Sequence, residues 1–518
     1  MASHSSCPAI DDRDETTPLL PNTCNAEAQN PSRRVTPLPK AQIAALCLVR
    51  LVDPIAFTQI FPYINEFIAF LHVTDDPSQI GYFSGLVEST FAVSQLLFIY
   101  HWARLSDVIG RRPVIMTGTL GVALSTMYFG VSSSIVDLLI SRCIAGVFAG
   151  TASVVHTVLG EITDSTNQAA AFPLYGLVWP IGSIIGFQYS LQLFRCLSHR
   201  SLFRPLIGGS FSSPASQFSI FKQTIFDRHP YFLPCFVAGL LSIVGFTLAY
   251  FCLGETLSTK RRFSAEKGYD HISCTSEHNT DCHDDIPVSP SARELLSFPI
   301  IRALSLSGFA LEANGTSFGV LYVLFCYSPI HSGGLAFPPS TIGYSLAFAG
   351  VIAGSVQVFL MPFLLRRIEA AKIYNLSIAA WPVTFLFLPI LNVIARCGLD
   401  ESTGQLRSRS HSALWVGIVI VLVLSRVGGI AYSASMILIR NNVPKPSYLG
   451  SANGLVQSSM CFSRCVSAAF ASSVFAFSDK YNVLGGYFWA LLHASIALIG
   501  CSLARDITRN SKNMLTET

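Results

Sequence analysis

Long apolar runs recur along the whole of this chain and are separated by short polar segments. The 518 residues are 51% hydrophobic and only 12% charged, about half the charged fraction of a typical soluble domain. A run of about 20 apolar residues is enough to cross a bilayer as a helix. A helix satisfies its own backbone hydrogen bonds and is therefore stable in hydrocarbon. The runs predict an all-α polytopic membrane protein embedded in the lipid bilayer.

The apolar runs form two sets of six, separated by a polar stretch. The predicted spans are 41–62, 80–101, 113–132, 135–158, 169–186 and 231–253, followed by 300–327, 341–364, 373–394, 414–438, 448–477 and 483–504. The predicted domains are a disordered cytoplasmic tail at 1–39, an N-terminal six-helix bundle at 40–253, a cytoplasmic central linker at 254–299, a C-terminal six-helix bundle at 300–505 and a cytoplasmic tail at 506–518.

The distribution of charge predicts the orientation of the chain. If both termini are placed in the cytoplasm, the cytoplasmic segments contain more Lys and Arg than the external loops. Cytoplasmic loops of membrane proteins usually carry such an excess, so both termini are predicted to be cytoplasmic. The net charge of +4 is small and spread along the chain, so it indicates no nucleic-acid partner. The 14 cysteines lie mostly singly in apolar runs, where a thiol behaves as a small hydrophobe, and they predict no disulfide framework.

A short polar stretch follows the second predicted span and carries four charges. These are Arg104, Asp107, Arg111 and Arg112. A charge at the centre of a bilayer costs about 3 kcal/mol or more, so we expect a tight hairpin loop at the membrane surface. Gly110 permits the backbone turn that such a loop needs.

Ionisable residues inside the predicted spans are functional candidates by default. They are Arg50, Asp53, Glu88, Arg142, Glu312, Arg426 and Arg464. Arg50 and Asp53 are three residues apart, so they share a helix face and can neutralise one another. The three carboxylates are candidate proton carriers, although the sequence does not distinguish among them. The alternative is that some of these residues only join helices as ion pairs.

Small and polar residues mark further contacts. Gly182 and Gly186 in the fifth span, and Gly428 with Gly429 in the tenth, permit close helix packing. Asn453 could place an amide in a cavity or bond to a neighbouring helix.

The central linker gathers possible metal ligands. These are His271, Cys274, His278, Cys282 and His283. Zinc takes such ligands, but the spacing matches no closed zinc module, so a solvated polar linker is the main interpretation.

The polar stretch resembles the signature loop between the second and third helices of the major facilitator superfamily, G-x-L-x-D-x-x-G-R-[RK]. Ser106, Asp107, Gly110, Arg111 and Arg112 match it. The residue at the first glycine position is instead an alanine. The resemblance implies a twelve-helix fold of two related halves, in which this loop controls the change between inward-open and outward-open states.

Two further stretches resemble motifs of this superfamily. Arg142 and Gly146 match the fourth-helix motif R-x-x-x-G, whose arginine is associated with proton coupling. In the antiporter branch the fifth helix ends in G-x-x-x-G-P-x-x-G-G, and its matching residues here are Gly182, Gly186, Pro205, Gly208 and Gly209.

Residues 187–204 interrupt the antiporter motif, and deleting them restores it without a gap. We therefore interpret this segment as an artefact, such as an intron left in the gene sequence. The alternative is a genuine loop that dismantles the motif. Sequencing of the mature transcript distinguishes the two interpretations.

The stretches Arg50–Pro54, Ile80–Gly85, Pro230–Pro234 and Gly254–Thr256 resemble a fungal branch akin to the plant zinc-induced facilitators. The resemblances together imply a fungal drug:proton antiporter-like transporter, and not an enzyme. The predicted function is proton-coupled efflux of a small organic molecule, driven by the proton gradient without a cofactor. Proton-coupled uptake of a nutrient or peptide, metal or organic-ligand homeostasis, and a non-transporting membrane sensor are the alternatives. We expect a monomer in the plasma membrane rather than the vacuolar membrane.

Overall fold

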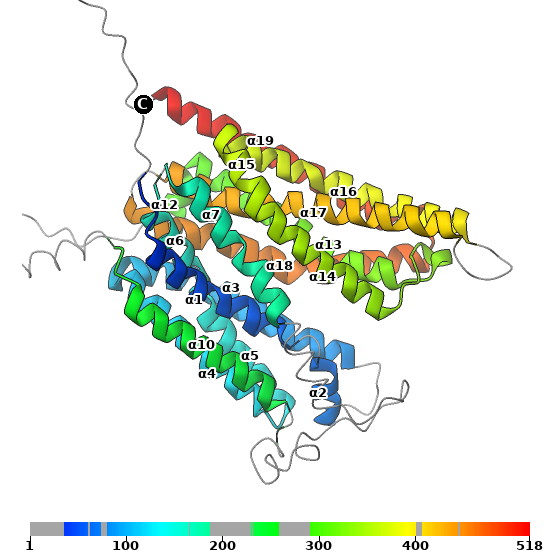
Figure 1. The fold of residues 1–518 in the computed structure, drawn as a ribbon, viewed down its shortest axis with the longest axis horizontal. Coiled ribbons are helices and arrows are strands. Elements are labelled where there is room, and N and C mark those ends of the chain that lie inside the picture. Colours follow the sequence, from blue (N-terminus) through cyan, green and yellow to red (C-terminus); the bar gives the residue numbers. More distant parts are fainter. Residues whose placement is uncertain are drawn as a thin grey trace, which may run out of the picture.

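A computed structural model of the chain describes residues 36–60, 63–73, 80–164, 166–186, 229, 231–257, 291–399, 407–443 and 446–517. In these ranges the chain is almost entirely helical (Figure 1). Twelve helical segments are long and apolar enough to cross a membrane. The predicted all-α fold with 12 transmembrane helices is thereby confirmed.

The first six spans make up the N-terminal half. They are built from α1 (Lys40–Thr58), α3 (Ile80–Ile109), α4 (Arg111–Gly130), α5 (Ile135–Ala149) with α6 (Ala152–Ile162), α7 (Gln168–Gly176) and α10 (Phe232–Cys252). The α7 span continues to Gly186. A short helix, α2 (Ile64–Phe70), follows α1.

The last six spans make up the C-terminal half. They are built from α13 (Pro299–Tyr327), α14 (Pro339–Ser355) with the π-helix η5 (Val356–Leu360) and α15 (Met361–Arg367), α16 (Ala370–Gly398), α17 (Ser408–Asn442), α18 (Leu449–Lys480) and α19 (Phe488–Glu517). A short helix, α12 (Ala292–Ser297), lies within the predicted central linker.

The two halves meet along α18, which packs against α3 and α6, and along α7, which packs against α15 and α17. In Figure 1 the halves lie side by side at the left end of the molecule and run apart toward the right. We call the left end the motif end, because α3 ends and α4 and α18 begin there.

Large apolar side chains cover the outer surface of both halves. Phe251 is 78% exposed, and Tyr344 and Phe359 are each 75% exposed. Such apolar exposure is unfavourable in water and favourable against lipid chains. The outward faces therefore fit the hydrocarbon of a bilayer, as the apolar runs predict.

The polar stretch is not the surface loop that we expected. Its first part is the last two turns of α3, Arg111 already belongs to α4, and only Gly110 interrupts the helices. Gly110 has φ of +105°, which a glycine adopts without strain. The prediction of a loop was wrong because charged residues are tolerated inside a protein when they are paired.

Candidate functional site

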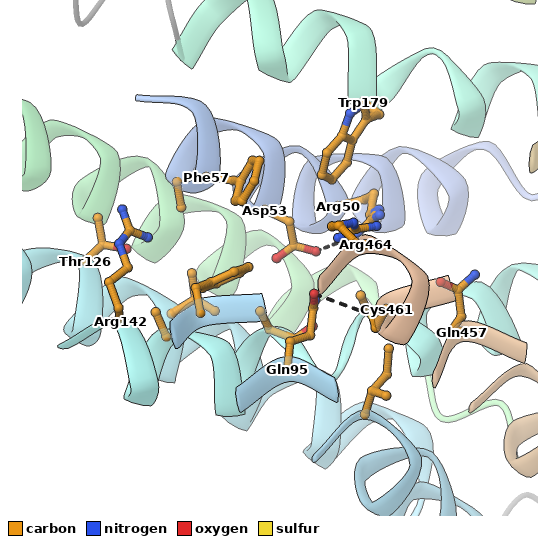
Figure 2. A pocket seen from close by; sticks show the side chains of 17 residues that line it. Arg50, Asp53, Phe57, Gln95, Thr126, Arg142, Trp179, Gln457, Cys461 and Arg464 are labelled. Atoms are coloured by element: carbon orange, nitrogen blue, oxygen red, sulfur yellow. Dashed lines mark hydrogen bonds and ion pairs between the residues drawn. The ribbon is translucent and has the colours of Figure 1, made fainter. Parts of the chain in front are cut away.

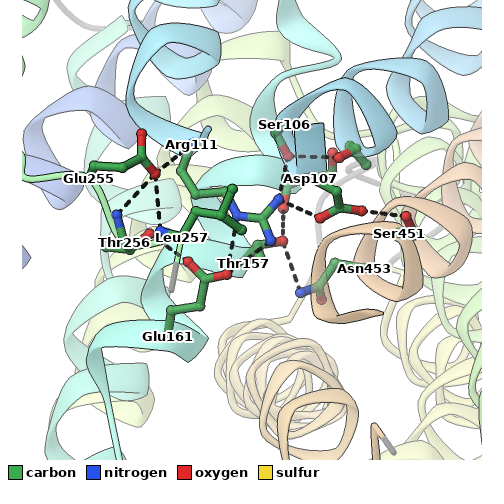
Figure 3. A network of polar contacts seen from close by, with 12 residues as sticks. Ser106, Asp107, Arg111, Thr157, Glu161, Glu255, Thr256, Leu257, Ser451 and Asn453 are labelled. Carbon is green, nitrogen blue, oxygen red and sulfur yellow. Dashed lines mark hydrogen bonds and ion pairs between the residues drawn. The ribbon is translucent and has the colours of Figure 1, made fainter. Parts of the chain in front are cut away.

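Arg111 organises the motif end of the N-terminal half. Its side chain is fully buried, although the guanidinium is charged. It donates to Ser106 Oγ at 2.7 Å, to Asp107 Oδ1 at 2.5 Å and to Glu161 Oε1 on α6 at 2.9 Å (Figure 3). Two carboxylates and a hydroxyl replace the water that burial removes, so the charge is stable there.

The same carboxylate links the two halves. Asp107 accepts a hydrogen bond from Ser451 Oγ in the first turn of α18 (Figure 3). A Cβ on Gly450 would overlap the Asp107 side chain, so glycine allows this close approach. Asn453 Nδ2 donates to Thr157 Oγ1 at 3.2 Å. Of the two uses predicted for Asn453, the structure shows the bond between helices.

Glu255 caps the N-terminus of α4. Its carboxylate accepts from the backbone N–H of Arg111 at 2.9 Å and of Arg112 at 3.2 Å. A helix begins with unpaired N–H groups and a partial positive charge, which a carboxylate stabilises. The neighbouring Thr256 donates to Glu161 at 2.5 Å. Sequence analysis missed Glu255 because it lies in the predicted linker, far from α4 along the chain.

Arg440 adds a second link between the halves at the motif end. Its Nε, at the end of α17, donates to the backbone oxygen of Gly160 at 2.8 Å, and its guanidinium also bonds to the backbone oxygen of Thr163. These oxygens lie at the end of α6, where carbonyl groups lack helical partners. The halves are thus joined at the motif end by side chains from both.

A cavity of about 380 Å³ lies between the halves, away from the motif end. Each half contains one arginine–carboxylate pair; Arg50, Glu312 and Arg464 line this cavity, whereas Asp53 lines the smaller cavity described below. Arg50 and Asp53 are 2.5 Å apart on α1, as their spacing predicts. Arg464 on α18 and Glu312 on α13 are 2.8 Å apart. The second pair joins two residues that we predicted separately, and it brings them to the same cavity.

A smaller cavity of about 50 Å³ is lined mostly by the N-terminal half and on one side by α18 (Figure 2). Its lining includes Asp53, Gln95 and Arg142. The Arg142 side chain is 5% exposed and stands 4.5 Å above the Phe129 ring, a favourable cation–π distance. Its Nε has no hydrogen-bond partner among the described residues. Asp53 and Arg142, two predicted candidates, therefore share one polar cavity.

Two other predicted residues lie differently. Glu88 is exposed on α3, forms no ion pair within the described chain, and is not among the residues that line either cavity. Arg426 lines the larger cavity and donates to Ser425 Oγ at 3.2 Å. Among the described residues, no carboxylate lies within 4.0 Å of Arg426.

The predicted small residues serve different purposes. Gly182 and Gly186 pack against α1, where a Cβ on Gly182 would lie 3.0 Å from Pro54 Cβ. A Cβ on Gly428 would lie 2.7 Å from the Trp381 ring, whereas one on its neighbour would meet nothing within 4 Å. Close packing was therefore predicted correctly for three of the four glycines and wrongly for the fourth, which faces open space.

Several polar or aromatic residues of the larger cavity were missed. They are His156, Tyr175, Trp179, Gln357, Trp381 and Tyr432. A histidine within an apolar run is unusual, and this signal could have identified His156. The remaining residues resemble ordinary buried residues in sequence, so only the packing of the halves identifies them.

Other predicted sites lie outside the described residues. These are the segment 187–204, the motif residues Pro205, Gly208 and Gly209, and the possible metal ligands His271, Cys274, His278, Cys282 and His283. In the part of the chain that is described, no three His, Cys, Asp or Glu residues form a group that could hold a metal ion.

The chain is similar to fungal proteins that are named as a transporter and an efflux pump, and to a plant protein named as a zinc-induced facilitator. The chain is 37% identical to the Major facilitator-type transporter psiT2 of Psilocybe cyanescens over 92% of each chain. It is 28% identical to the efflux pump azaK of Aspergillus niger, covering 95% of this chain and 94% of the other. It is 24% identical to Protein ZINC INDUCED FACILITATOR 1 of Arabidopsis thaliana over 88% of each chain.

Solved structures share the fold. The human organic anion transporter MFSD10 superposes with a TM-score of 0.61 and 16% identity, covering 90% of this chain and 100% of the other. A bacterial homologue of the iron transporter ferroportin in its outward-facing state superposes with a TM-score of 0.59 and 15% identity, covering 92% and 100%. The sequence profile of the Major Facilitator Superfamily matches residues 46–468. The chain therefore belongs to the Major Facilitator Superfamily and is a multi-pass membrane transporter, not an enzyme.

Proposed function

We propose that this chain is a secondary transporter that exports a small organic molecule in exchange for protons. The observation that carries the proposal is the cavity between the halves, which is lined by Arg50, the ion-pair partner of Asp53, and by the ion pair of Arg464 with Glu312. A cavity of about 380 Å³ is within the size range of small-molecule sites. Two related fungal proteins are named as an efflux pump and a multidrug transporter, which supports the direction of transport.

The two pairs suggest how proton and substrate exchange. Protonation of Asp53 or Glu312 removes one negative charge and weakens the ion pair with its arginine. The freed arginine changes the polarity of the cavity and the position of the helix that bears it. A proton entering from outside would thereby favour release of substrate to that side, and loss of the proton to the cytoplasm would restore the pair.

The two ends of the molecule differ in how the halves meet, and this difference suggests how access alternates. Polar contacts from Asp107 and Arg440 join the halves at the motif end. With both termini in the cytoplasm, as the distribution of Lys and Arg indicates, the motif end is cytoplasmic and the cavity is reached from outside. Opening the motif end while the other end closes would present the cavity to the cytoplasm. We propose this cycle for a monomer in the plasma membrane.

Inside-out vesicles test the proposal. A pH gradient, acidic inside, should drive accumulation of one or more members of a panel of small acids, neutral compounds and amines, and a protonophore should abolish it. Asp53→Asn and Glu312→Gln each remove one candidate proton site, and at least one of them should abolish the dependence on the gradient. Asp137→Asn is the matched control, because Asp137 lies in the first turn of α5, away from both cavities.

Accumulation that persists without a pH gradient, or that requires the opposite gradient, would contradict proton-coupled export. The second result would instead indicate uptake by symport.

A further inference from the structure

We infer that the larger cavity recognises a small organic anion, whose negative group pairs with Arg426 while its body bridges the two halves. The inference rests on the proposed function, because it names the substrate class of the same cavity. It follows from the balance of charge, from unpartnered polar atoms, and from the position of open space in the cavity.

The charge of the cavity is unbalanced. Arg50 and Arg464 each have a carboxylate partner, at 2.5 and 2.8 Å. Arg426 also lines the cavity, and in the described chain no carboxylate lies within 4.0 Å of it. A charged guanidinium away from bulk water needs an anion or several hydrogen bonds, yet Ser425 Oγ is the hydrogen-bond partner that the structure shows. A ligand carboxylate, sulfonate or phosphate would supply the missing charge.

Polar atoms without hydrogen-bond partners also line the cavity, on both halves. His156 on α6 is 4% exposed, and neither ring nitrogen has a hydrogen-bond partner within the described structure. The same is true of the Tyr175 hydroxyl, whose ring meets the His156 ring at 85°. On the C-terminal side, Trp381 Nε1 is also unpartnered. Because buried polar groups are nearly always hydrogen-bonded, these atoms indicate a ligand with polar groups of its own.

The two kinds of group lie on different halves. Arg426 belongs to α17 of the C-terminal half, whereas His156 and Tyr175 belong to α6 and α7 of the N-terminal half. Trp179 and Tyr432 also line the cavity and offer flat apolar surfaces to a ring. A ligand that reaches both groups contacts both halves at once. Its affinity then depends on the distance between the halves, as alternating access requires.

Gly429 shows where the body of the ligand can lie. It is three residues after Arg426 on α17 and lines the same cavity, and a Cβ there would meet nothing within 4 Å. Residues three apart share one helix face, so this open space lies next to the guanidinium. A Cβ at Gly429 would enter this space without meeting protein atoms, so a larger residue there supplies a second, independent test.

Three probes that share a ring and differ in charge test the inference on the full chain in lipid nanodiscs. They are 2-naphthylacetate, 2-naphthylethanol and 2-naphthylethylamine, whose binding is measured by calorimetry against empty nanodiscs. The acid should bind at least tenfold more tightly than the alcohol, and the amine should bind most weakly. Arg426→Gln should remove the preference, Arg426→Lys should keep it, and Arg426→Glu should favour the amine.

Two further variants supply a control and a second test. Arg409→Gln removes an exposed arginine of the same helix and should leave all three affinities unchanged. Gly429→Leu should weaken binding of the acid at least tenfold, although Arg426 is intact.

Equal binding of acid and alcohol, no binding of the acid at millimolar concentration, or a preference that survives Arg426→Gln would each overturn the inference. Binding is measured without a proton gradient. Charge-selective binding without gradient-driven flux would therefore contradict the proposed export and leave the anion site standing, whereas flux without charge selectivity would do the reverse.

Discussion

Replacing Asp107 by Asn tests whether the contacts at the motif end hold the two halves together. Asn is nearly the same size and still accepts the hydrogen bond from Arg111, which keeps its ion pair with Glu161 at 2.9 Å. The change removes the negative charge that accepts a bond from Ser451 in the first turn of α18. The variant should therefore fold, with a weaker contact between the halves.

The size of the effect follows from two losses. A hydrogen bond to a charged group contributes about 1.5–3 kcal/mol. A negative charge at a helix N-terminus contributes about 0.3–1 kcal/mol, and up to about 2 kcal/mol when partly buried. Asp107 is 6% exposed, so solvent screens these terms little. A net loss of about 2 kcal/mol of contact free energy shifts the equilibrium by roughly 30-fold toward the state in which the halves are separated at the motif end.

Electron–electron resonance between two spin labels measures this equilibrium. Labels at Leu105 and Asn441, both exposed, report the separation of the halves at the motif end. In a background without reactive cysteines, Asp107→Asn should raise the population at the longer distance. Asp137→Asn, the same chemical change at the start of α5, should not. If the distance distribution of Asp107→Asn matches that of the unmodified chain, the contact does not control which end is closed.

Three further predictions concern stability, measured by thermal unfolding in detergent. Arg464→Gln leaves Glu312 buried without its partner and should lower stability by about 3 kcal/mol. The double variant with Glu312→Gln should recover most of the loss, because both charges are then removed, and no recovery would contradict a direct pair. Gly146→Leu places a Cβ 2.8 Å from Ser94 Cβ on α3 and should lower stability by about 1–3 kcal/mol. At Gly85 a Cβ would meet nothing within 4 Å, so Gly85→Leu should lower stability little. Equal losses would refute the packing argument. Glu255→Ala removes the cap of α4 and should cost about 1 kcal/mol, and an unchanged midpoint would show that the cap is dispensable.

The transmembrane helices could be predicted from sequence because the length and apolarity of a run are local properties. The pair of Arg50 and Asp53 was predictable for the same reason, since three residues on one helix set their distance. The pair of Arg464 and Glu312 was not, because 152 residues separate them and only the packing of α18 against α13 brings them together. Contacts between helices determine most of the candidate site.

The prediction failed where it treated charge as a sign of exposure. Arg111 suggested a hairpin loop at the membrane surface, yet it is fully buried at the start of α4 among two carboxylates and a hydroxyl. Glu88 lies in the second span, as predicted, but its side chain is exposed and is not among the residues that line either cavity. Whether a charged side chain is buried depends on its pairing partners and on the direction in which its helix face points. Neither can be obtained from the sequence of one span alone.

Substrate-induced proton movement tests the exchange of substrate for protons most directly. Proteoliposomes that contain a pH-sensitive dye receive the purified chain and a transported compound from the vesicle panel, using both the full sequence and a version without residues 187–204. Export coupled to protons predicts that adding the compound moves protons in the opposite direction, at least in the shortened version, and that Asp53→Asn or Glu312→Gln abolishes the signal. Movement of the compound in both versions with no change in internal pH would contradict it.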